Sequence, residues 1–398
     1  MNKKLENQII NIFQGKQIKD NPTCYIYDLN IIKNNVDAVM NYAPQNIGLY
    51  YAMKANPNKY ILKYLKSLDE VKGIEIASSG ELSKAMKYYD PKNILFTGPA
   101  KTLIEIEEAL KYNIRLINVE SIIEAIRINK IASELKIEKV DILLRINLNH
   151  KIEEAAENMG GISTKMGIEE DNYLDEYKII SKLEHLNIKG IHVFSASGIL
   201  DYKGSIKYAN YVFEMVNKLE LQGQHVEIID LGGGLGIDYS GNDVEFDTKT
   251  YFEELRNLIN KYSFNDKEII LELGCYLVGT AGYYAAKIID IKNSKGYKHV
   301  VIAGGLNHIP TATLNGKHPF HIIKMNEEKE YDSQLFVHEE KVDIDGPLCT
   351  AEDKVLWDVY IDHAEIGDIV LIRQAGAYCY SCAWLEFLSR KHPKEIIL

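Results

Sequence analysis

Eight short apolar runs, each ending in polar or glycine residues, follow one another along the first part of this chain of 398 residues. They lie at residues 49–53, 73–77, 94–96, 115–119, 141–146, 190–194, 226–231 and 269–273. Most are separated by segments whose apolar residues recur every three or four positions, which indicates helices. These segments are residues 59–68, 81–89, 101–112, 122–135, 205–219 and 251–262. A strand followed by a helix, repeated about eight times, predicts a parallel (β/α)8 barrel.

Two of the expected helices begin with a capping signal. Ser78 with Glu81, and Ser121 with Glu124, have the spacing of a capping box. In that motif a hydroxyl and a carboxylate satisfy backbone N–H groups of the first turn. We therefore expect these two helices to start at the serines.

The pattern changes after Gly282. Runs typical of strands occupy residues 284–291, 300–303, 355–361 and 369–373, with a turn at 293–296. They predict an antiparallel β domain. We expect a barrel domain over residues 25–280 and a β-rich C-terminal domain over 281–398. The N-terminal segment 1–24 should belong to the C-terminal domain.

The charge of the chain favours small-molecule partners. The net charge is -11, and Lys and Arg are scattered among Asp and Glu, whereas phosphate backbones require clustered basic residues. We expect no nucleic-acid partner. No stretch approaches the roughly 20 apolar residues that cross a bilayer, and no cleavable signal follows the first residues. We therefore expect a cytoplasmic protein that makes no membrane contact.

The five cysteines indicate reduced thiols, because their number is odd and the chain has no secretion signal. Cys379 and Cys382 form a C-x-x-C pair. A structural zinc site usually needs four ligands, and the sequence has no second pair. Chance spacing explains the pair better than a metal or redox site, and we expect no metal.

The carboxyl ends of the strands should carry the chemistry, since catalytic groups of such barrels gather there. The residues at these ends are Lys54, Ser78, Glu120, Arg145, 194–197, 232–234 and Glu272. A lone amine such as Lys54 can trap a carbonyl group. Glu272 would be costly in an apolar barrel mouth without a positive partner. A protonated ring nitrogen would satisfy it, and so would a structural ion pair with Arg145.

Three further motifs allow both a functional and a structural interpretation. The glycines in residues 230–236 leave backbone N–H groups exposed, and such groups can bind a phosphate. A tight turn also needs glycine. Cys349 lies in a loop beside acidic residues, where a thiol is either reactive or inert. Tyr378 follows a flexible turn and could donate to a phosphate or pack at a domain edge.

Taken together and in this order, these motifs resemble the fold type III pyridoxal-phosphate decarboxylases, the family of diaminopimelate and ornithine decarboxylases. The resemblance spans nearly the whole chain. It implies an alanine-racemase-like (β/α)8 barrel with a C-terminal antiparallel β domain, pyridoxal 5'-phosphate as cofactor, and a homodimer with shared active sites. Residues 192–197, 303–308 and 387–395 are more similar to secondary-metabolism members, which act in staphyloferrin B and butirosin synthesis.

The resemblance also implies roles for individual residues. Lys54 is similar to the Schiff-base lysine, Glu272 to the acid that pairs with the pyridine nitrogen, and Cys349 to a catalytic thiol that serves the neighbouring subunit. The cofactor-binding residues it implies are Lys54, Glu75, Arg145, Phe194, Ser197, Gly232, Gly233, Gly234, Glu272, Gly274 and Tyr378. For the substrate, the candidate contacts are Asn307, His308 and Asp353, with His318 as a further candidate.

Three positions depart from the family pattern. Phe194 stands where many relatives have a histidine stacked on the cofactor ring, so stacking is kept and a polar edge is lost. Cys275 replaces an arginine, which removes a charge partner for the phosphate. Cys379 replaces a glycine, which changes the local turn.

We therefore expect a carboxy-lyase that uses pyridoxal phosphate to decarboxylate an L-amino acid or an amino-acid conjugate, in a secondary-metabolite or siderophore pathway. The alternatives are a decarboxylase of the diaminopimelate or ornithine type in primary metabolism, and a non-catalytic homologue that binds a partner. A racemase on the same barrel fits less well, because racemases place an arginine at the position of Glu272.

Overall fold

The computed structural model describes residues 3–15, 18–152, 157–158, 160–242, 244–310, 318–325 and 336–398. The chain divides into two compact units. The barrel unit comprises Lys33–Ile237 and Val244–Leu277, and the β unit comprises Met1–Ile32, Asp238–Asp243 and Val278–Leu398.

The barrel unit is built on eight parallel strands, as the apolar runs predict. They are β2 (Ile47–Ala52), β3 (Val71–Ile76), β4 (Ile94–Phe96), β5 (Leu116–Val119), β6 (Val140–Asn147), β9 (Leu186–Val193), β11 (Ile228–Asp230) and β12 (Glu268–Leu273). Pairing runs in this order and returns from β12 to β2, so the sheet closes into a barrel. The two-residue β8 (Ile168–Glu169) adds to β6, and β7 (Glu157–Asn158) pairs with β10 (Ala196–Ser197).

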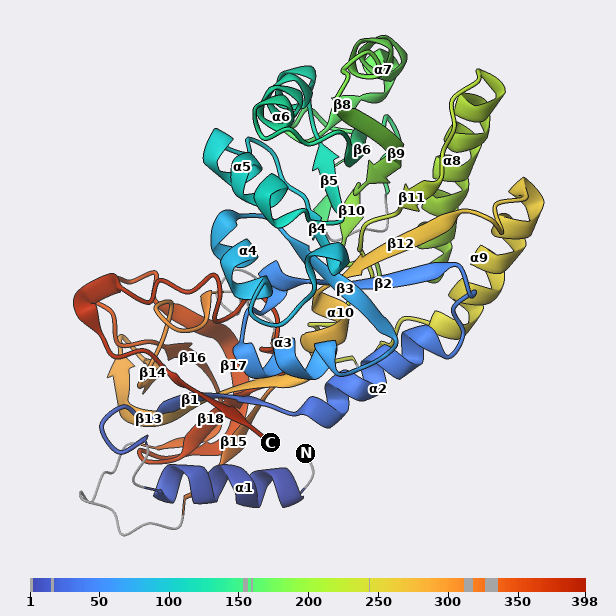
Figure 1. The fold of residues 1–398 in the computed structure, drawn as a ribbon. Helices are drawn as coiled ribbons and strands as arrows, with labels where there is room; N and C mark the ends of the chain where they lie inside the picture. Colours follow the sequence, from blue (N-terminus) through green and yellow to red (C-terminus); the bar gives the residue numbers. More distant parts are fainter. Residues whose placement is uncertain are drawn as a thin grey trace. The chain divides into compact units, whose positions relative to one another are not determined.

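Helices alternate with these strands and lie outside the barrel (Figure 1). They are α3 (Lys59–Lys66), α4 (Ser79–Ala85), α5 (Leu103–Tyr112), α6 (Ile122–Glu134), α7 (Tyr173–Ile180), α8 (Tyr202–Leu221) and α9 (Thr248–Tyr262), with α2 (Leu29–Met40) before them and α10 (Cys275–Val278) after. Short 3-10 turns are η2 (Met53–Ala55), η3 (Pro91–Asn93), η4 (Glu170–Asn172) and, in the β unit, η5 (Phe387–Ser389). Among the described residues, none of the helices has the length and apolar character that a bilayer crossing requires.

The helix starts show which capping signals operate. Ser78 and Ser121 accept hydrogen bonds from the N–H groups three residues later, as expected. The carboxylate of Glu81 accepts from the N–H of Ala77, not from that of the cap residue itself. The reciprocal capping box occurs instead at Thr102, whose hydroxyl accepts from the N–H of Glu105 at 3.3 Å while that carboxylate accepts from the N–H of Thr102 at 2.9 Å.

The barrel interior is filled by side chains. A buried cluster draws one residue from each of six strands: Tyr50, Leu95, Leu116, Leu143, Ile228 and Ile270. Gly73 makes room for the largest of them, because a Cβ at this position would lie 2.5 Å from the Tyr50 ring and 2.1 Å from the carbonyl oxygen of Asn93. The barrel is therefore a packed core whose chemistry must lie at its ends.

The β unit contains a sheet with the strand order β15-β18-β13-β14-β16-β17, and β1 pairs with both β13 and β19. The strands are β1 (Thr23–Tyr27), β13 (Gly282–Ser294), β14 (Tyr297–Ile302), β15 (Phe320–Ile323), β16 (Val337–Asp345), β17 (Lys354–Ala364), β18 (Ile369–Ile372) and β19 (Lys394–Ile397). Most pairs are antiparallel, as predicted. Two pairs, β14 with β16 and β1 with β19, are parallel. Each parallel pair joins strands far apart in sequence, which no short-range pattern could predict.

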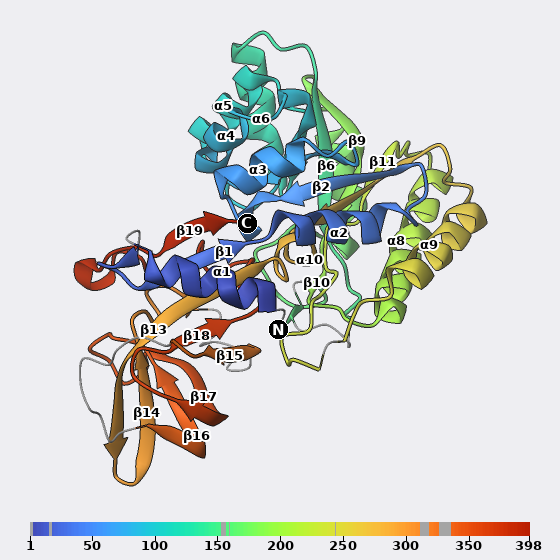
Figure 2. The same ribbon diagram turned by 90° about the horizontal axis from the view of Figure 1, so that it is seen from below.

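Helix α1 (Lys3–Gln14) packs on the β unit (Figure 2). Its buried residues Ile9 and Phe13 lie in one apolar cluster with Cys24 of β1, Ala285 of β13 and Leu371 of β18. The N-terminal segment thus contributes to the core of this unit. The units divide between Ile32 and Lys33 and between Leu277 and Val278, whereas the expected boundaries follow residues 24 and 280. Asp238–Asp243 also belongs to the β unit.

The capping box of α5 gives a first prediction. Replacing Thr102 with Ala should lower the free energy of unfolding by about 1 kcal/mol, because the hydroxyl acceptor for the first turn is lost. Thr102→Ser keeps the hydroxyl and should remain close to wild type. Urea unfolding of the three proteins measures the difference, and equal losses in both variants would show that the hydroxyl is not responsible.

Candidate active site

Lys54 faces a buried acid. Lys54 lies in η2, directly after β2. Its Nζ is 2.9 Å from Oε2 of Glu75, at the end of the neighbouring strand β3. The Lys54 side chain is 39% exposed, so the amine is accessible, whereas Glu75 is fully buried. Burial raises the pKa of Glu75 to about 7, with Lys54 opposing the shift and the charge of Glu272 adding to it. Glu75 can therefore exchange a proton near neutral pH.

Glu272 reaches the same region from β12, the other neighbour of β2. Its Oε1 accepts from the hydroxyl of Thr97 at 3.3 Å, and its Oε2 lies 3.5 Å from Nε2 of His192. Burial opposes ionisation of this carboxyl, yet His192, Lys54 and Asp230 together lower its pKa to about 2. Glu272 is therefore a buried anion at neutral pH, as a partner for a protonated ring nitrogen must be.

Arg145 pairs with a different acid. Its Nη1 lies 2.7 Å from Oε1 of Glu120, and both side chains are nearly inaccessible. The second oxygen of Glu120 accepts from the N–H of Gly167 at 2.9 Å. The described ion pair of Arg145 is thus with Glu120, not with Glu272 as the structural alternative supposed. Arg145 therefore does not neutralise the charge of Glu272.

The glycine loop 232–234 is tightly packed. Gly232 and Gly234 have φ of 66° and 112°, in the region that favours glycine. A Cβ on Gly232 would lie 2.8 Å from Cδ2 of Phe194, and one on Gly233 would lie 2.4 Å from the carbonyl oxygen of Glu272. The packing alone therefore requires glycine here, and the phosphate-binding role of the loop stays a prediction. The ring of Phe194 lies against this loop.

Two further expected cofactor-binding residues, Ser197 and Gly274, lie close to these elements. Ser197 is half-buried in β10, after the loop that begins with Phe194. Gly274 follows β12, where a Cβ would lie 2.9 Å from Cβ of Ala55. The close approach at Gly274 brings the end of β12 against the turn that carries Lys54.

Sequence reasoning missed three residues of this cluster: Thr97, His192 and Asp230. Thr97 and His192 contact Glu272 directly, and Asp230 influences its ionisation. Asp230 ends β11 immediately before the glycine loop, and His192 is the only titratable residue among the last four of β9. Polar residues at the carboxyl ends of otherwise apolar strands were the signal that could have found both.

The remaining catalytic candidates belong to the β unit. Cys349 is exposed in the loop between β16 and β17. Tyr378 follows β18 with φ of 60° and is half-buried. The neighbouring Cys379 is buried, Cys382 is exposed, and all five cysteines are free thiols. An exposed thiol and a half-buried phenol are both accessible to a ligand, and their roles stay predictions.

The substrate candidates are buried within the β unit. Asp353 accepts from the N–H groups of Leu306 and Leu348, each at 2.7 Å, so its carboxylate joins two loops. His308 contacts the hydroxyl of Tyr284 at 3.1 Å, and burial lowers its pKa to about 4. Oδ1 of Asn307 accepts from the N–H of Gly305, and Nδ1 of His318 contacts the carbonyl oxygen of Arg373. These bonds favour structural roles, and substrate contact by any of the candidates stays a prediction.

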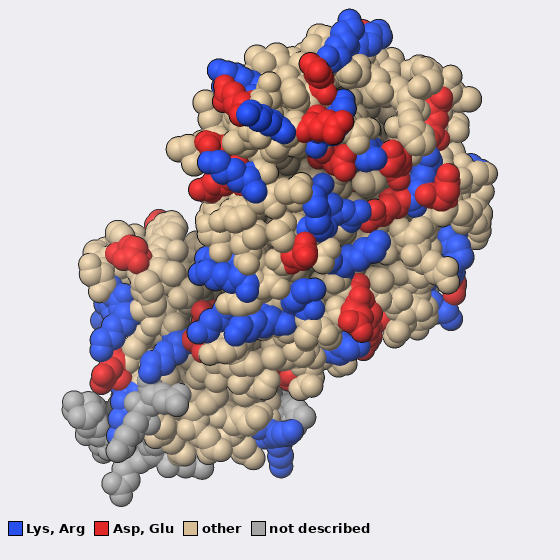
Figure 3. Space-filling view, in the orientation of Figure 1, with Lys and Arg blue, Asp and Glu red and all other residues tan. Residues whose placement is uncertain are grey.

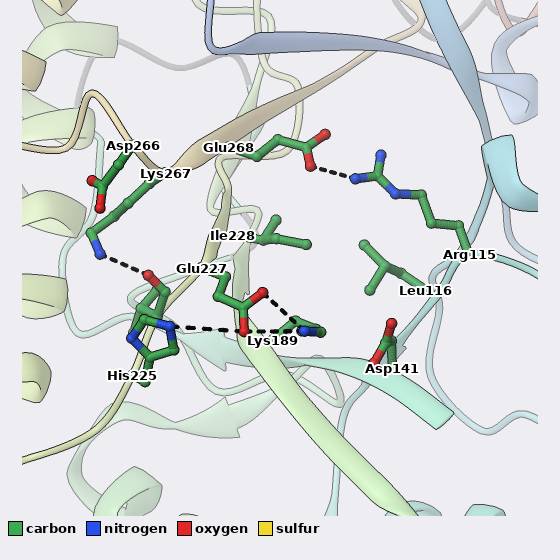
Figure 4. Close-up of a pocket in the computed structure, with 11 residues that line it drawn as sticks. Arg115, Leu116, Asp141, Lys189, His225, Glu227, Ile228, Asp266, Lys267 and Glu268 are labelled. Carbon is green, nitrogen blue, oxygen red and sulfur yellow. Dashed lines mark hydrogen bonds and ion pairs between the residues drawn. The ribbon is translucent and has the colours of Figure 1, made fainter. Parts of the chain in front are cut away.

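A pocket of about 470 Å³ lies at the opposite, amino end of the barrel strands (Figure 4). Its lining contains Arg115, Leu116, Asp141, Lys189, His225, Val226, Glu227, Ile228, Asp266, Lys267 and Glu268. Basic and acidic groups pair here, as in Arg115 with Glu268 and Lys189 with Glu227. Such paired charges at the amino end of a barrel support stability more than catalysis.

Charges of both signs are interspersed on the face shown in Figure 3. Exposed ion pairs, such as Lys111 with Glu107 and Lys341 with Asp358, likewise bring opposite charges together. Mixed charge of this kind is typical of a solvated surface.

The residues at the carboxyl end of the barrel fit an aldehyde cofactor with a ring nitrogen. Lys54 offers an accessible amine, and Glu272 is a buried anion close to it in the fold. Oε1 of Glu75 is buried without a hydrogen-bond partner among the described residues. The site thus defines a barrel enzyme of the pyridoxal type.

Comparison with known proteins then identifies the family. Residues 29–279 match the family model described as "Pyridoxal-dependent decarboxylase, pyridoxal binding domain". The chain therefore belongs to the pyridoxal-dependent decarboxylases, and the predicted family, barrel fold, cofactor and enzyme class are confirmed.

Curated relatives match over almost their whole length. The chain is 29% identical to the 2-[(L-alanin-3-ylcarbamoyl)methyl]-2-hydroxybutanedioate decarboxylase of Staphylococcus aureus, covering 97% of both chains. It is 30% identical to the L-glutamyl-[BtrI acyl-carrier protein] decarboxylase of Niallia circulans, with 94% of this chain and 88% of the relative covered. The solved diaminopimelate decarboxylase of Helicobacter pylori in complex with L-lysine matches with a TM-score of 0.84 at 29% identity, over 98% and 93% of the two chains.

The elevated pKa of Glu75 gives a second prediction. A carboxyl with a raised pKa binds its proton more tightly in the folded state, so its contribution to stability falls as pH rises from 4.5 to about 7. Glu75→Gln abolishes this titration. In cofactor-free protein, the variant should gain stability relative to wild type across that window, by up to about 3 kcal/mol.

Urea unfolding at both ends of the pH window measures the effect. Glu107→Gln removes an exposed glutamate of α5 and is the matched control, which should follow the wild-type pH dependence. Identical pH dependence in Glu75→Gln and wild type would contradict the assigned titration.

Proposed function

We propose that this decarboxylase acts on an L-amino acid whose side chain is enlarged by a conjugated carboxylic acid, in a siderophore or related secondary pathway. The observation that carries the proposal is the match to the staphylococcal enzyme, which covers 97% of both chains and whose name specifies such a conjugate. A second observation concerns residues 304–310. They contain no Arg or Lys that could bind a distal carboxylate of free diaminopimelate.

The barrel residues divide the work of binding and activation. When bound, pyridoxal phosphate supplies an aldehyde for the substrate amine and a ring that accepts the electron pair left when CO2 departs. Lys54 provides the amine that holds the cofactor. Glu75, 2.9 Å away and with its pKa near neutrality, can take up or return a proton at Lys54 Nζ.

Glu272 and Phe194 prepare the site for the ring. The Glu272 carboxylate, ionised and buried, would keep the ring nitrogen protonated and thereby stabilise negative charge that develops beside it. Phe194, packed on Gly232, offers an apolar face for stacking. The N–H groups of Gly233 and Gly234 are proposed phosphate donors, because the N–H of Gly232 already donates to Asp230. The hydroxyl of Tyr378 is a further proposed donor.

We propose a homodimer as the working form. By resemblance, Cys349 enters the active site of the neighbouring subunit, where its thiol supplies the proton that replaces CO2 on the substrate carbon. The exposure of Cys349 supports this role. Five free thiols also support a reducing compartment, and we place the enzyme in the cytoplasm.

The main alternative is a diaminopimelate decarboxylase of primary metabolism. Its support is 30% identity to the Helicobacter pylori enzyme over 94% of this chain. Carrier-bound glutamate, named for the Niallia circulans relative, is a further substrate class.

A panel of substrates separates these possibilities. With cofactor present, the amide conjugate of L-2,3-diaminopropionate and citrate should release CO2 with a higher kcat/KM than meso-diaminopimelate, L-ornithine or carrier-bound L-glutamate. Released CO2 and the amine product are measured together. A clear preference for diaminopimelate would refute the conjugate proposal and leave the decarboxylase class intact.

Subunit mixing tests the shared site. Lys54→Ala and Cys349→Ala proteins should each be nearly inactive, whereas an equilibrated mixture should recover roughly a quarter of wild-type activity, because half of the dimers are mixed and each has one intact site. Activity of the mixture is compared with that of each variant alone. A mixture no more active than its components would contradict a site shared between subunits, as would full activity of Cys349→Ala alone.

A further inference from the structure

We propose that Asp230 and Glu272 share one proton, and that Asp230 and His192 are positioning residues which hold Glu272 as an oriented anion. This inference rests on the proposed role of Glu272 at the cofactor ring. It concerns Asp230 at the end of β11 and His192 near the end of β9, two buried groups that have no role in the proposed reaction.

The three side chains come from adjacent strands. Asp230 of β11 is in register with His192 of β9, and β11 is hydrogen-bonded to β12, which carries Glu272. One ligand atom of each lies within 4.8 Å of the others. Asp230 and His192 are fully buried, and Glu272 is 5% exposed.

Two carboxyl groups this close and this deeply buried cannot both be ionised at neutral pH. Oδ1 of Asp230 already accepts from the N–H of Gly232 at 2.9 Å. Oδ2 is buried and has no hydrogen-bond partner among the described residues. A proton on Oδ2, directed at Glu272, satisfies this orphan oxygen and removes the repulsion between the two acids.

The pKa values of the two acids shift in opposite directions, which assigns the proton to Asp230. Burial, together with the charge of Glu272, raises the pKa of Asp230 well above its usual range. The pKa of Glu272 is lowered, so the pair is a carboxylic acid beside a carboxylate. A donated O–H fixes the rotamer of Glu272 while preserving its single negative charge.

His192 completes the cluster as a neutral group. Burial lowers its pKa, so it is uncharged at neutral pH and lowers the pKa of Glu272 by its charge only under acidic conditions, where it is protonated. Its Nε2 is 3.5 Å from Oε2 of Glu272, and neither ring nitrogen has a hydrogen bond among the described residues. Other titratable groups that influence the three are Lys54, Glu75, Glu120, Arg145 and Tyr208.

Infrared spectroscopy tests the shared proton without the cofactor reaction. Holoenzyme and cofactor-free wild type should both show the C=O stretch of a protonated carboxylic acid at roughly pH 9, well above the pKa of Glu75. The band should disappear in Asp230→Asn. Asp141→Asn, an identical change at the opposite end of the barrel, should retain it. A wild-type spectrum without the band would overturn the proposal.

Cofactor binding tests the positioning role. Asp230→Asn keeps an N–H donor for Glu272 and should bind pyridoxal phosphate within about twofold of wild type, whereas Asp230→Ala should bind roughly tenfold more weakly. Binding is followed by fluorescence titration, and circular dichroism confirms folding. Wild-type affinity in Asp230→Ala would overturn the positioning role. Glu272→Gln tests the ring contact separately, since wild-type affinity there would refute that contact and leave the infrared result unaffected.

The same three side chains have a donor set that could hold a divalent ion. Metal analysis of the purified holoenzyme distinguishes this from a shared proton. If a proton is shared, the holoenzyme should contain less than one equivalent of metal per subunit. A chelator should then leave its affinity for pyridoxal phosphate unchanged. One equivalent of metal, lost in Asp230→Asn and in His192→Asn, would overturn it.

Discussion

The attraction between one accessible amine and the buried acids around it is the interaction on which this site depends. Lys54 is a neighbour of Glu75 on one side and of the strand carrying Glu272 on the other. Burying acids at the mouth of an apolar barrel is unfavourable unless positive charge or shared protons compensate. The site is therefore built so that protonation at Lys54, at Glu75 and at the pair formed by Asp230 and Glu272 is coupled.

The barrel makes this coupling possible by bringing distant segments together at one end. Strands β3, β2, β12, β11 and β9 are consecutive neighbours in the closed sheet, although β2 and β12 are separated by most of the unit in sequence. The glycine loop that follows β11 is equally dependent on this arrangement. Its backbone packs against Phe194 after β9 and against Glu272 of β12, so a side chain on Gly232 would displace Phe194 and one on Gly233 would displace Glu272.

Periodicity located all eight barrel strands because each contains a short stretch of buried apolar residues, even where residues such as Lys72 of β3 and Lys189 of β9 interrupt the strand. It also located most of the helices around them. Position at the strand ends predicted Lys54 and Glu272, whereas Glu75 was predicted only from the family resemblance, and His192 and Asp230 at two other strand ends were missed. The partners of the site residues were not readable. Arg145 of β6 pairs with Glu120 at the end of the neighbouring β5, and His192 of β9 lies beside Glu272 of β12 across the intervening β11. Such pairings depend on side-chain directions that periodicity does not give. The parallel pairing of β1 with β19 escaped prediction because these strands are far apart in sequence.

The phenylalanine at position 194 has a physical consequence for the acid cluster. A histidine edge beside the glycine loop would offer hydrogen bonds and, when protonated, a positive charge that favours ionised carboxyls. Phe194 offers neither, and it lies against Gly232, whose N–H is the donor to Asp230. An apolar ring at this place adds no positive charge that would offset the effect of Glu272, whose charge raises the pKa of Asp230 and favours its protonated form. Phe194 is therefore compatible with the proton shared by Asp230 and Glu272. It adds no positive charge that would stabilise both acids as carboxylates.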